Sequence, residues 1–249
     1  MSDTEEQRPR KSDIFHKFSR ALKRARKNWL FGFVFDFVVI VGTALVLSVL
    51  IKAFLIRSFF IPSGSMLETL QINDRIIVNV MAPEVFPLER GDVVVFRDPG
   101  GWLGLVPENQ KTTWEELSDF VLGTFGITAP DSAEHLVKRV IGLPGDEVVC
   151  CDADGKLTVN GTSISEPYLA PGATPSDIEF RVFVPQDSYW VMGDNRGNST
   201  DSRYHQDLPS RGFVDKSFVV GRAILISWPF ENWTWLENYP EVFSDVPNP

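Results

Sequence analysis

The stretch 61–66, Ile-Pro-Ser-Gly-Ser-Met, presents a serine in a setting that suits nucleophilic chemistry. Pro62 restricts its own φ and biases the residue before it toward extended geometry, while Gly64 permits backbone conformations that other residues resist. We therefore expect Ser65 on a sharp turn, where a hydroxyl nucleophile and an oxyanion hole can form. The alternative interpretation of the same residues is an ordinary Pro/Gly/Ser loop.

A lysine among apolar residues is the second candidate. Lys138 lies in the run 135–146, and strand alternation would point Leu136, Lys138 and Val140 to the same face. Burial on such a face lowers a lysine pKa from about 10.4 by as much as 3–5 units, which makes the neutral amine available as a general base. The alternative is a lysine whose stem packs while its ammonium reaches water.

A polar loop at 193–203, Gly-Asp-Asn-Arg-Gly-Asn-Ser-Thr-Asp-Ser-Arg, is the third candidate. Its side chains can orient a buried amine and build an ion-paired floor beneath it, although a turn-rich loop with no such role has a similar composition. Acyl transfer from a peptide needs a nucleophile, a base and donors for the oxyanion, and serine with lysine is a recurring solution.

Histidine and metal chemistry are weaker interpretations of this sequence. His16 lies in the N-terminal arm, which leaves His135 and His205, and no G-x-S-x-G motif surrounds a serine. Cys150 and Cys151 are adjacent instead of C-x-x-C, and the histidines do not cluster. The pattern therefore predicts no metal site, and it implies no cofactor.

The adjacent cysteines leave three possibilities outside the cytoplasm: a vicinal bridge, two thiols, or a bridge between molecules. Both lie in the predicted strand 147–151, where successive side chains point to opposite faces. We therefore expect Cys150 and Cys151 to be separate thiols.

The elements that must position these residues begin with an apolar run at 29–51, which carries a single charge, Asp36. This run is long enough to cross a bilayer as a helix, and we expect a permanent anchor over 29–56. Asp36 is expected at the interface or beside a partner. A cleaved signal peptide is disfavoured because the run is too long and no small-x-small site follows it.

The charge distribution gives an orientation to this anchor. Residues 1–28 contain nine Lys or Arg against four acids, so we expect the N-terminus in the cytoplasm and residues from 57 onward outside. This basic arm either lies on anionic lipid or is a solvated tail that enforces topology. The rest of the chain is strongly acidic, which does not suit nucleic acid as a partner.

Short β-branched runs dominate the chain after Ser65 and predict a mainly β domain over 57–249. The predicted strands are 75–80, 92–97, 147–151, 156–159, 179–184, 189–192 and 218–228, with turns at 152–155 and 160–161. An insertion at about 100–134 interrupts them and contains a predicted short helix at 113–122. We interpret this insertion as a surface excursion, and contact with lipid or a partner is the alternative.

The three motifs, in this order behind an anchor, resemble type I signal peptidases. They are Pro-Ser-Gly-Ser-Met at 62–66, Lys-Arg-Val-Ile-Gly-Leu-Pro-Gly-Asp at 138–146, and the loop 193–203. The resemblance implies a membrane-anchored serine endopeptidase with an outside-facing β-rich catalytic domain. Such an enzyme removes N-terminal signal peptides from exported preproteins through an acyl-enzyme formed by a Ser-Lys dyad.

The resemblance also implies a role for each matching residue. Ser65 would be the nucleophile and Lys138 the general base, while the Ser63 side chain and the Ser65 N–H would form the oxyanion hole. Supporting positions in the third motif are Gly193, Ser199, which would orient the lysine, and the ion pair of Asp201 with Arg203. The expected substrate pocket is lined by Phe59, Ile61, Met66 and Val137.

Two departures from the family pattern and one rival function stay open. The position that is often acidic in the third motif is Gly197, which implies a different local ion pairing, and the insertion leaves pocket details outside the motifs undetermined. The rival is an anchored β-domain that binds exported chains without cutting them. The expected partners are preproteins and the lipid bilayer, and the oligomeric state is unknown.

The C-terminal segment 228–235 contains three of the seven tryptophans, Trp228, Trp233 and Trp235. Amphipathic indole rings favour the lipid interface, so this segment is a candidate for membrane contact. A packed domain edge would produce the same pattern.

Overall fold

A computed structural model of the chain describes residues 29–104 and 135–249. The chain divides into two compact units, one ending at Ile51 and the other beginning at Lys52. The predicted basic arm 1–28 lies outside the described residues, as do most of the insertion and its predicted helix at 113–122.

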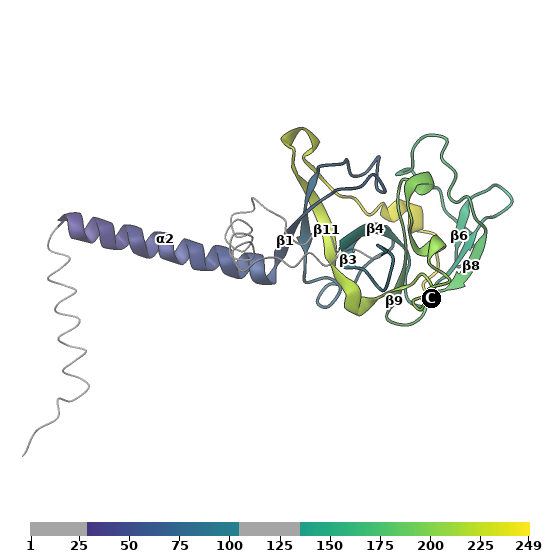
Figure 1. The fold of residues 1–249 in the computed structure, drawn as a ribbon, viewed down its shortest axis with the longest axis horizontal. Coiled ribbons are helices and arrows are strands. Elements are labelled where there is room, and N and C mark those ends of the chain that lie inside the picture. Colours follow the sequence, from purple (N-terminus) through teal and green to yellow (C-terminus); the bar gives the residue numbers. More distant parts are fainter. Residues whose placement is uncertain (1–28, 105–134) are drawn as a thin grey trace, which may run out of the picture. The chain divides into compact units, whose positions relative to one another are not determined.

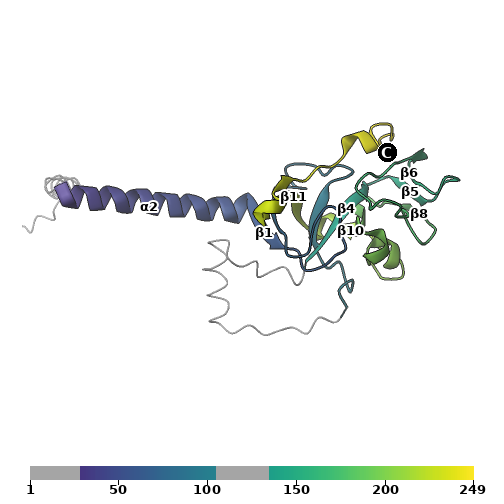
Figure 2. The ribbon, with the colours of Figure 1, turned by 90° about the horizontal axis from the view of Figure 1, so that it is seen from above.

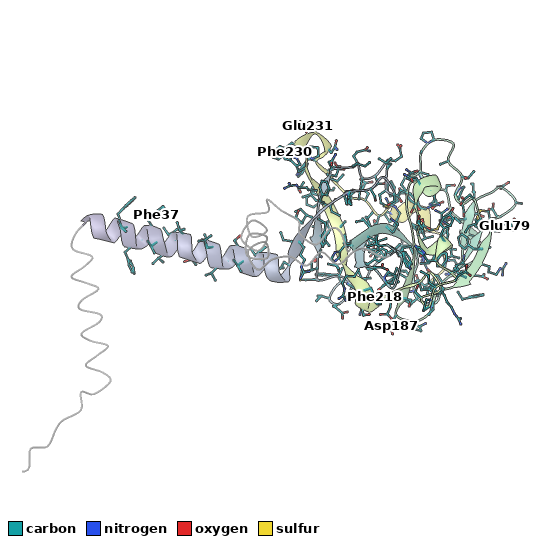
Figure 3. The ribbon with its side chains drawn as sticks, in the orientation of Figure 1. Phe37, Glu179, Asp187, Phe218, Phe230 and Glu231 are labelled. Carbon is teal, nitrogen blue, oxygen red and sulfur yellow. A yellow bond between two sulfur atoms is a disulfide. The ribbon has the colours of Figure 1, made fainter. Side chains whose placement is uncertain are left out.

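The N-terminal helix α2 (Trp29–Phe54) is 26 residues long and covers nearly all of the predicted anchor. Its stretch Gly32–Val49 is apolar and long enough to cross a membrane, and none of these residues is buried. Apolar side chains such as Phe37 project from the helix (Figure 3). Because an α-helix satisfies its backbone hydrogen bonds internally, exposed apolar side chains around it suit a lipid environment.

The described residues of the second unit form two antiparallel sheets, and the larger one includes Lys138 (Figure 1). Its strands run in the order β1-β2-β11-β3-β4-β9-β10, and β12 pairs with β11. Their bounds are β1 (Ile56–Phe60), β2 (Arg75–Asn79), β3 (Val93–Arg97), β4 (His135–Gly142), β9 (Ser188–Met192), β10 (Val214–Asp215), β11 (Val219–Trp228) and β12 (Thr234–Trp235).

The smaller sheet has the order β7-β6-β5-β8, formed by β5 (Glu147–Cys150), β6 (Leu157–Val159), β7 (Thr162–Ser163) and β8 (Phe180–Phe183). Figure 2 shows β5, β6 and β8 at the side of the domain away from β1. Asn160 and Gly161 both have positive φ and form the predicted turn between β6 and β7. The prediction of a mainly β domain after one apolar helix is confirmed, and the predicted strands match to within one or two residues.

Short 3-10 helices connect several of the strands. They are η2 (Arg196–Asn198), η3 (Ser202–Tyr204), η4 (Lys216–Phe218), η5 (Phe230–Asn232) and η6 (Pro240–Phe243). Two of them, η2 and η3, lie within the polar loop that follows β9. This loop therefore has a defined backbone that can hold buried charges in place.

An apolar cluster anchors the turn that carries Ser65. Met66 and Leu70 follow this turn and are buried together with Ile76 and Val78 of β2. Burying a large aliphatic side chain stabilises a fold by about 1.5–3 kcal/mol. Met66 and Leu70 therefore tie the turn to the sheet beneath it.

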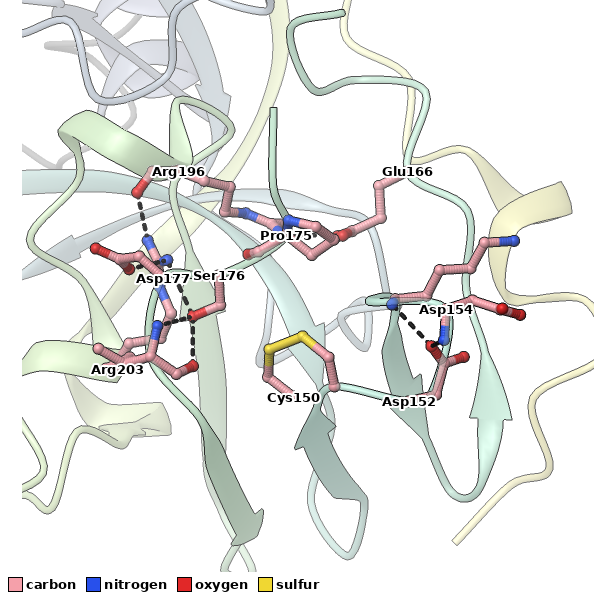
Figure 4. The surroundings of a disulfide bond; sticks show 12 residues. Cys150, Asp152, Asp154, Glu166, Pro175, Ser176, Asp177, Arg196 and Arg203 are labelled. Atoms are coloured by element: carbon pink, nitrogen blue, oxygen red, sulfur yellow. Dashed lines mark hydrogen bonds and ion pairs between the residues drawn. A yellow bond between two sulfur atoms is a disulfide. The ribbon is translucent and has the colours of Figure 1, made fainter. Parts of the chain in front are cut away.

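The structure contradicts the expectation of two separate thiols. Cys150 and Cys151 form a disulfide, drawn at the centre of Figure 4, and the peptide bond between them is cis. The expectation relied on side-chain alternation along one strand, but β5 ends at Cys150. Cys151 lies beyond the strand, so the alternation rule does not apply to the pair.

Candidate active site

Ser65 and Lys138 meet although 72 residues separate them in the sequence. The Lys138 Nζ donates to Ser65 Oγ at 2.7 Å and to the Val137 carbonyl at 2.9 Å. Lys138 lies in the middle of β4, opposite Val94 of β3, and only 4% of it is exposed. A hydroxyl and an amine at this distance can exchange a proton directly once the amine is neutral.

The surroundings of Lys138 disfavour its charged form. Burial lowers the pKa of Lys138 from the ordinary lysine value to about 8, and the negative charges of Asp201 and Asp194 oppose this shift. The direction agrees with the expectation from the sequence. An amine with this pKa is neutral in an appreciable fraction of molecules slightly above neutral pH.

The backbone on both sides of Ser65 is held by the polar loop. The Asn195 N–H donates to the Ser65 carbonyl at 3.1 Å, and Asn195 Nδ2 donates to the Gly64 carbonyl at 2.9 Å. The neighbouring N–H groups close a local turn, because Leu67 N donates to Gly64 O and Leu70 N to Met66 O. The position of the Ser65 hydroxyl is therefore fixed through its main chain.

Ser63 stands next to the nucleophile candidate. Its Oγ lies 3.4 Å from Ser65 Oγ, and either hydroxyl can be the donor. Ser63 is exposed, so its hydroxyl is free to rotate toward a group bound at Ser65. Its predicted role as an oxyanion donor agrees with this position and stays a prediction.

The third motif contains the predicted ion pair. Arg203 Nε donates to Asp201 Oδ1 at 2.8 Å and Arg203 Nη2 donates to Asp201 Oδ2 at 2.9 Å, with both side chains fully buried. Asp201 also accepts the Gly193 N–H at 2.9 Å. The pair thus fixes the start of the loop as well as its end.

Gly193 is required by close approach. A Cβ at this position would lie 2.2 Å from Ser199 Oγ and 2.5 Å from the Ser65 carbonyl oxygen. The loop therefore approaches the nucleophile so closely that no side chain fits between them.

Ser199 is near this contact, and its hydroxyl is buried. Among residues 29–104 and 135–249, it has no hydrogen-bond partner. The hydrogen bonds of Lys138 Nζ go to Ser65 and Val137 instead. The proposed orientation of the lysine by Ser199 therefore stays a prediction.

The two histidines of the domain have other surroundings. His205 packs on Trp102 with ring centroids 4.4 Å apart, and burial lowers its pKa. His135 lies in β4 opposite Arg97, with its ring 5.1 Å from that of Phe59. The amine of Lys138 is hydrogen-bonded to the Ser65 hydroxyl.

A small apolar cleft opens beside the dyad, with a volume of about 140 Å³. It contains all four residues that the sequence predicted for the substrate pocket. The full lining is Phe59, Phe60, Ile61, Pro62, Ser63, Ser65, Met66, Leu103, His135, Leu136, Val137 and Lys138. The four residues therefore share one cleft beside Ser65 and Lys138, and their role in binding substrate stays a prediction.

Leu103 is a lining residue that the motifs did not reveal, because it comes from the start of the insertion. The Asp98 carboxylate accepts the N–H groups of Gly100, Trp102 and Leu103, at 2.9, 2.9 and 3.1 Å. Trp102 is buried against Phe96 with ring centroids 5.6 Å apart. An Asp followed by Pro-Gly-Gly was the available signal for this turn.

A second buried ion pair joins the dyad strand to the polar loop. Arg139 Nη2 lies 2.7 Å from Asp194 Oδ2, with both side chains fully buried, and Thr69 Oγ1 donates to the same carboxylate oxygen. Arg139 and Asp194 stand directly beside Lys138 and Gly193 in the motifs. Their position next to Lys138 and Gly193 in the sequence was the signal that could have identified Arg139 and Asp194 as site residues.

Comparison with known proteins gives a consistent result. A family model described as "Signal peptidase, peptidase S26" matches residues 34–228. A signal peptidase I of Mycobacterium tuberculosis is 37% identical over 221 residues, covering 80% of this chain and 74% of the relative. A signal peptidase I of Bacillus amyloliquefaciens is 34% identical, covering 79% of this chain and 89% of the relative.

Solved structures are also similar to this chain. One of them is the crystal structure of a signal peptidase I from Enterococcus faecalis V583, which is 26% identical to this chain. The match has a TM-score of 0.33 and covers 54% of this chain and 95% of the other.

Proposed function

The chain belongs to the signal peptidase family, peptidase S26, whose members remove signal peptides from preproteins, and we propose that it does so with Ser65 as nucleophile and Lys138 as general base. The observation that supports this assignment is the 2.7 Å hydrogen bond between Lys138 Nζ and Ser65 Oγ at a buried amine. Serine and lysine are a known combination for acyl transfer.

The first step forms the acyl-enzyme. Neutral Lys138 accepts the Ser65 Oγ proton while Oγ attacks the scissile carbonyl carbon, and the carbonyl oxygen becomes an oxyanion. The Ser65 N–H and the Ser63 hydroxyl would donate to that oxyanion. The Lys138 ammonium then protonates the leaving amine as the peptide C–N bond breaks, which restores the neutral amine.

The second step releases the signal peptide. Lys138 takes a proton from water, and the resulting hydroxide attacks the ester carbon at Ser65. The C–O bond to Ser65 breaks, and the proton held by Lys138 returns to Ser65 Oγ. Each turnover consumes one water and leaves both residues in their starting states.

The cleft supports a preference for small residues before the cut. Ile61, Met66 and Val137 would form its walls, and an extended peptide would add to the neighbouring strands through main-chain hydrogen bonds. We expect small side chains immediately before the cut and two residues upstream. A substrate with an aromatic residue directly before the cut that is processed as fast as one with alanine would contradict this preference.

Membrane anchoring by α2 is part of the same proposal. The basic arm predicts a cytoplasmic N-terminus and a catalytic domain outside the cytoplasm. The exposed rings of Trp228, Trp233 and Trp235 would add contact with lipid, together with Phe230, which lies at the tip of the loop between β11 and β12 (Figure 3). Protease accessibility of the domain in sealed vesicles of known orientation would test the topology.

The decisive test of the function uses the full chain and a signal-peptide-bearing precursor. Ser65→Ala should abolish cleavage while leaving precursor binding unchanged, because only the nucleophile is removed. Ser244→Ala, an exposed serine near the C-terminus, serves as the matched control. Cleavage that persists in Ser65→Ala would rule out Ser65 as the nucleophile. A parent chain that binds the precursor without cleaving it would instead favour a domain that binds exported chains without cutting them.

A further inference from the structure

Arg196 is a buried cation in the polar loop, and the chemistry above does not use it. Its side chain is 2% exposed, and its Nε donates to the Gly193 carbonyl at 3.0 Å. The main-chain carbonyl of Arg196 accepts a hydrogen bond from Arg203 Nη2 at 2.9 Å. A guanidinium cannot be deprotonated in a protein, so this buried charge requires an anionic partner.

That partner comes from the long connection between β7 and β8. Glu166 Oε1 and Oε2 lie 2.5 and 2.9 Å from the two terminal nitrogens of Arg196, and the Glu166 side chain is also 2% exposed. The Pro175 carbonyl accepts from Arg196 at 2.8 Å. Tyr168 donates its hydroxyl to Glu166 Oε1 at 2.8 Å, which fixes the carboxylate from the other side.

The same connection contacts the polar loop at a second point. Arg203 Nη1 lies 3.4 Å from Ser176 Oγ and 3.5 Å from Asp177 Oδ1, and the Tyr204 hydroxyl donates to the Asp177 carboxylate at 2.6 Å. Figure 4 shows Arg196 beside Pro175 and Glu166, while Arg203 faces Ser176 and Asp177. The segment 166–177 therefore contacts the outer side of the polar loop at two points, Arg196 and Arg203.

The inner side of the polar loop holds the nucleophile. Arg196 fixes the Gly193 carbonyl, and Asn195, between the two, donates to the carbonyls of Ser65 and Gly64. Three contacts therefore lead from the Glu166 carboxylate to the main chain of Ser65: Glu166 with Arg196, Arg196 with Gly193, and Asn195 with Ser65. A shift of the loop would move the hydroxyl relative to Lys138, and displacements on the order of 1 Å can cost about 10²-fold in rate.

We propose that Glu166 is a positioning residue for the reaction of Ser65, acting through Arg196 on the loop that holds the nucleophile main chain. This inference rests on the proposed function. Glu166 contacts neither the cleft nor the dyad, so its effect falls on the chemical step and not on substrate binding. Since Asp201 and Asp194 are the groups that oppose the shift of Lys138, Glu166 acts on position and leaves the ionisation of the amine in place.

The test compares Glu166→Gln with Glu147→Gln in the full chain, using a precursor peptide. Glu147 also pairs with an arginine, Arg181, at 2.9 Å, and 67% of the Arg181 side chain is exposed. Because this pair lies outside the polar loop, Glu147→Gln is a matched control. We expect kcat of Glu166→Gln to fall at least tenfold, with KM within threefold and an unchanged pH midpoint. Glu147→Gln should match the parent in kcat.

Three outcomes would overturn the inference: an unchanged kcat in Glu166→Gln, a loss that appears only in KM, or an equal loss in Glu147→Gln. If Glu166→Gln does not fold, Tyr168→Phe removes only the hydroxyl that fixes the carboxylate. A severalfold lower kcat in that variant supports the inference, and a parental kcat overturns it. Failure of the proposed function would appear separately, as cleavage by Ser65→Ala.

Discussion

Lys138 lies between two regions of opposite character. On one side is the apolar cleft with Ile61 and Val137, and on the other is the polar loop with Asp194 and Asp201. Burial lowers the pKa of the amine, while the two carboxylates raise it. The pKa of about 8 is therefore a balance, in which burial on the apolar side favours the neutral amine and the carboxylates on the polar side limit the shift.

The largest effect is expected when the base itself can no longer lose its proton. Lys138→Arg should lower kcat/KM by about 10⁴-fold at every accessible pH, because a guanidinium stays protonated and general base catalysis contributes about 10²–10⁴-fold. Lys156→Arg, at an exposed position, is the control.

In the parent, kcat/KM should rise with pH through about 8 and then level off. A flat parental profile from about pH 6 to 10 would refute the dyad.

The next largest effect should come from forcing the polar loop away from the nucleophile. Gly193→Ala places a Cβ 2.5 Å from the Ser65 carbonyl oxygen, and we expect kcat to fall about 10²-fold as the turn shifts. Gly197→Ala is a close control, since a Cβ there meets nothing within 4 Å. Steady-state kinetics of both variants would check this, and equal activities would show that the close approach does not matter.

Removing one carboxylate from the polar side should lower the pKa of Lys138 while leaving the amine in place. Asp201→Asn removes the carboxylate that raises the pKa of Lys138 more than Asp194 does, so the pH midpoint of kcat/KM should move below about 8. The variant should also be less stable by about 3–5 kcal/mol, because buried Arg203 loses its partner. Asp154→Asn, in an exposed turn, is the control for both readouts. A midpoint that stays in place would assign the shift to burial alone.

The smallest effect is expected on the apolar side. Leu103→Ala should widen the cleft and raise the relative kcat/KM for a larger residue before the cut by roughly 3–10-fold, since one or two methylenes discriminate by about 1–3 kcal/mol. Val85→Ala, an exposed valine outside the cleft, should keep the parental preference. Competition between precursor peptides that differ at a single position would measure both variants.

The two regions also differ in how far the sequence predicts them. Ser65, Lys138, Asp201 and Arg203 stand in dense local motifs. Turn chemistry and strand alternation made Ser65 and Lys138 candidates, and the family resemblance implied a role for each of the four residues. The strands followed from β-branched runs and Gly or Asn turns, because these signals are local in the chain. In the structure, Lys138 Nζ lies within hydrogen-bonding distance of Ser65 Oγ. Their roles as base and nucleophile, which the family resemblance implies, stay a prediction.

The residues that the sequence did not identify act through contacts between segments that are distant in the chain. Glu166 is an ordinary acidic residue in a loop until the fold brings it to Arg196, 30 residues later. Leu103 reaches the cleft only because Asp98 folds the chain into a turn. The prediction that Cys150 and Cys151 are separate thiols was wrong because the strand ends one residue earlier than predicted.

The buried amine also has a consequence for the folding equilibrium. The pKa of Lys138 is 10.5 in an ordinary setting and about 8 in the fold, so below about pH 8 both states are protonated and the folded state carries the whole penalty, about 3 kcal/mol. Between about pH 8 and 10.5 the folded state releases its proton first, and the free energy of unfolding rises with pH. Denaturant titrations of the parent and Lys138→Met should therefore differ most near pH 7 and converge toward pH 10. At neutral pH the residue proposed as the general base therefore lowers the stability of the native domain.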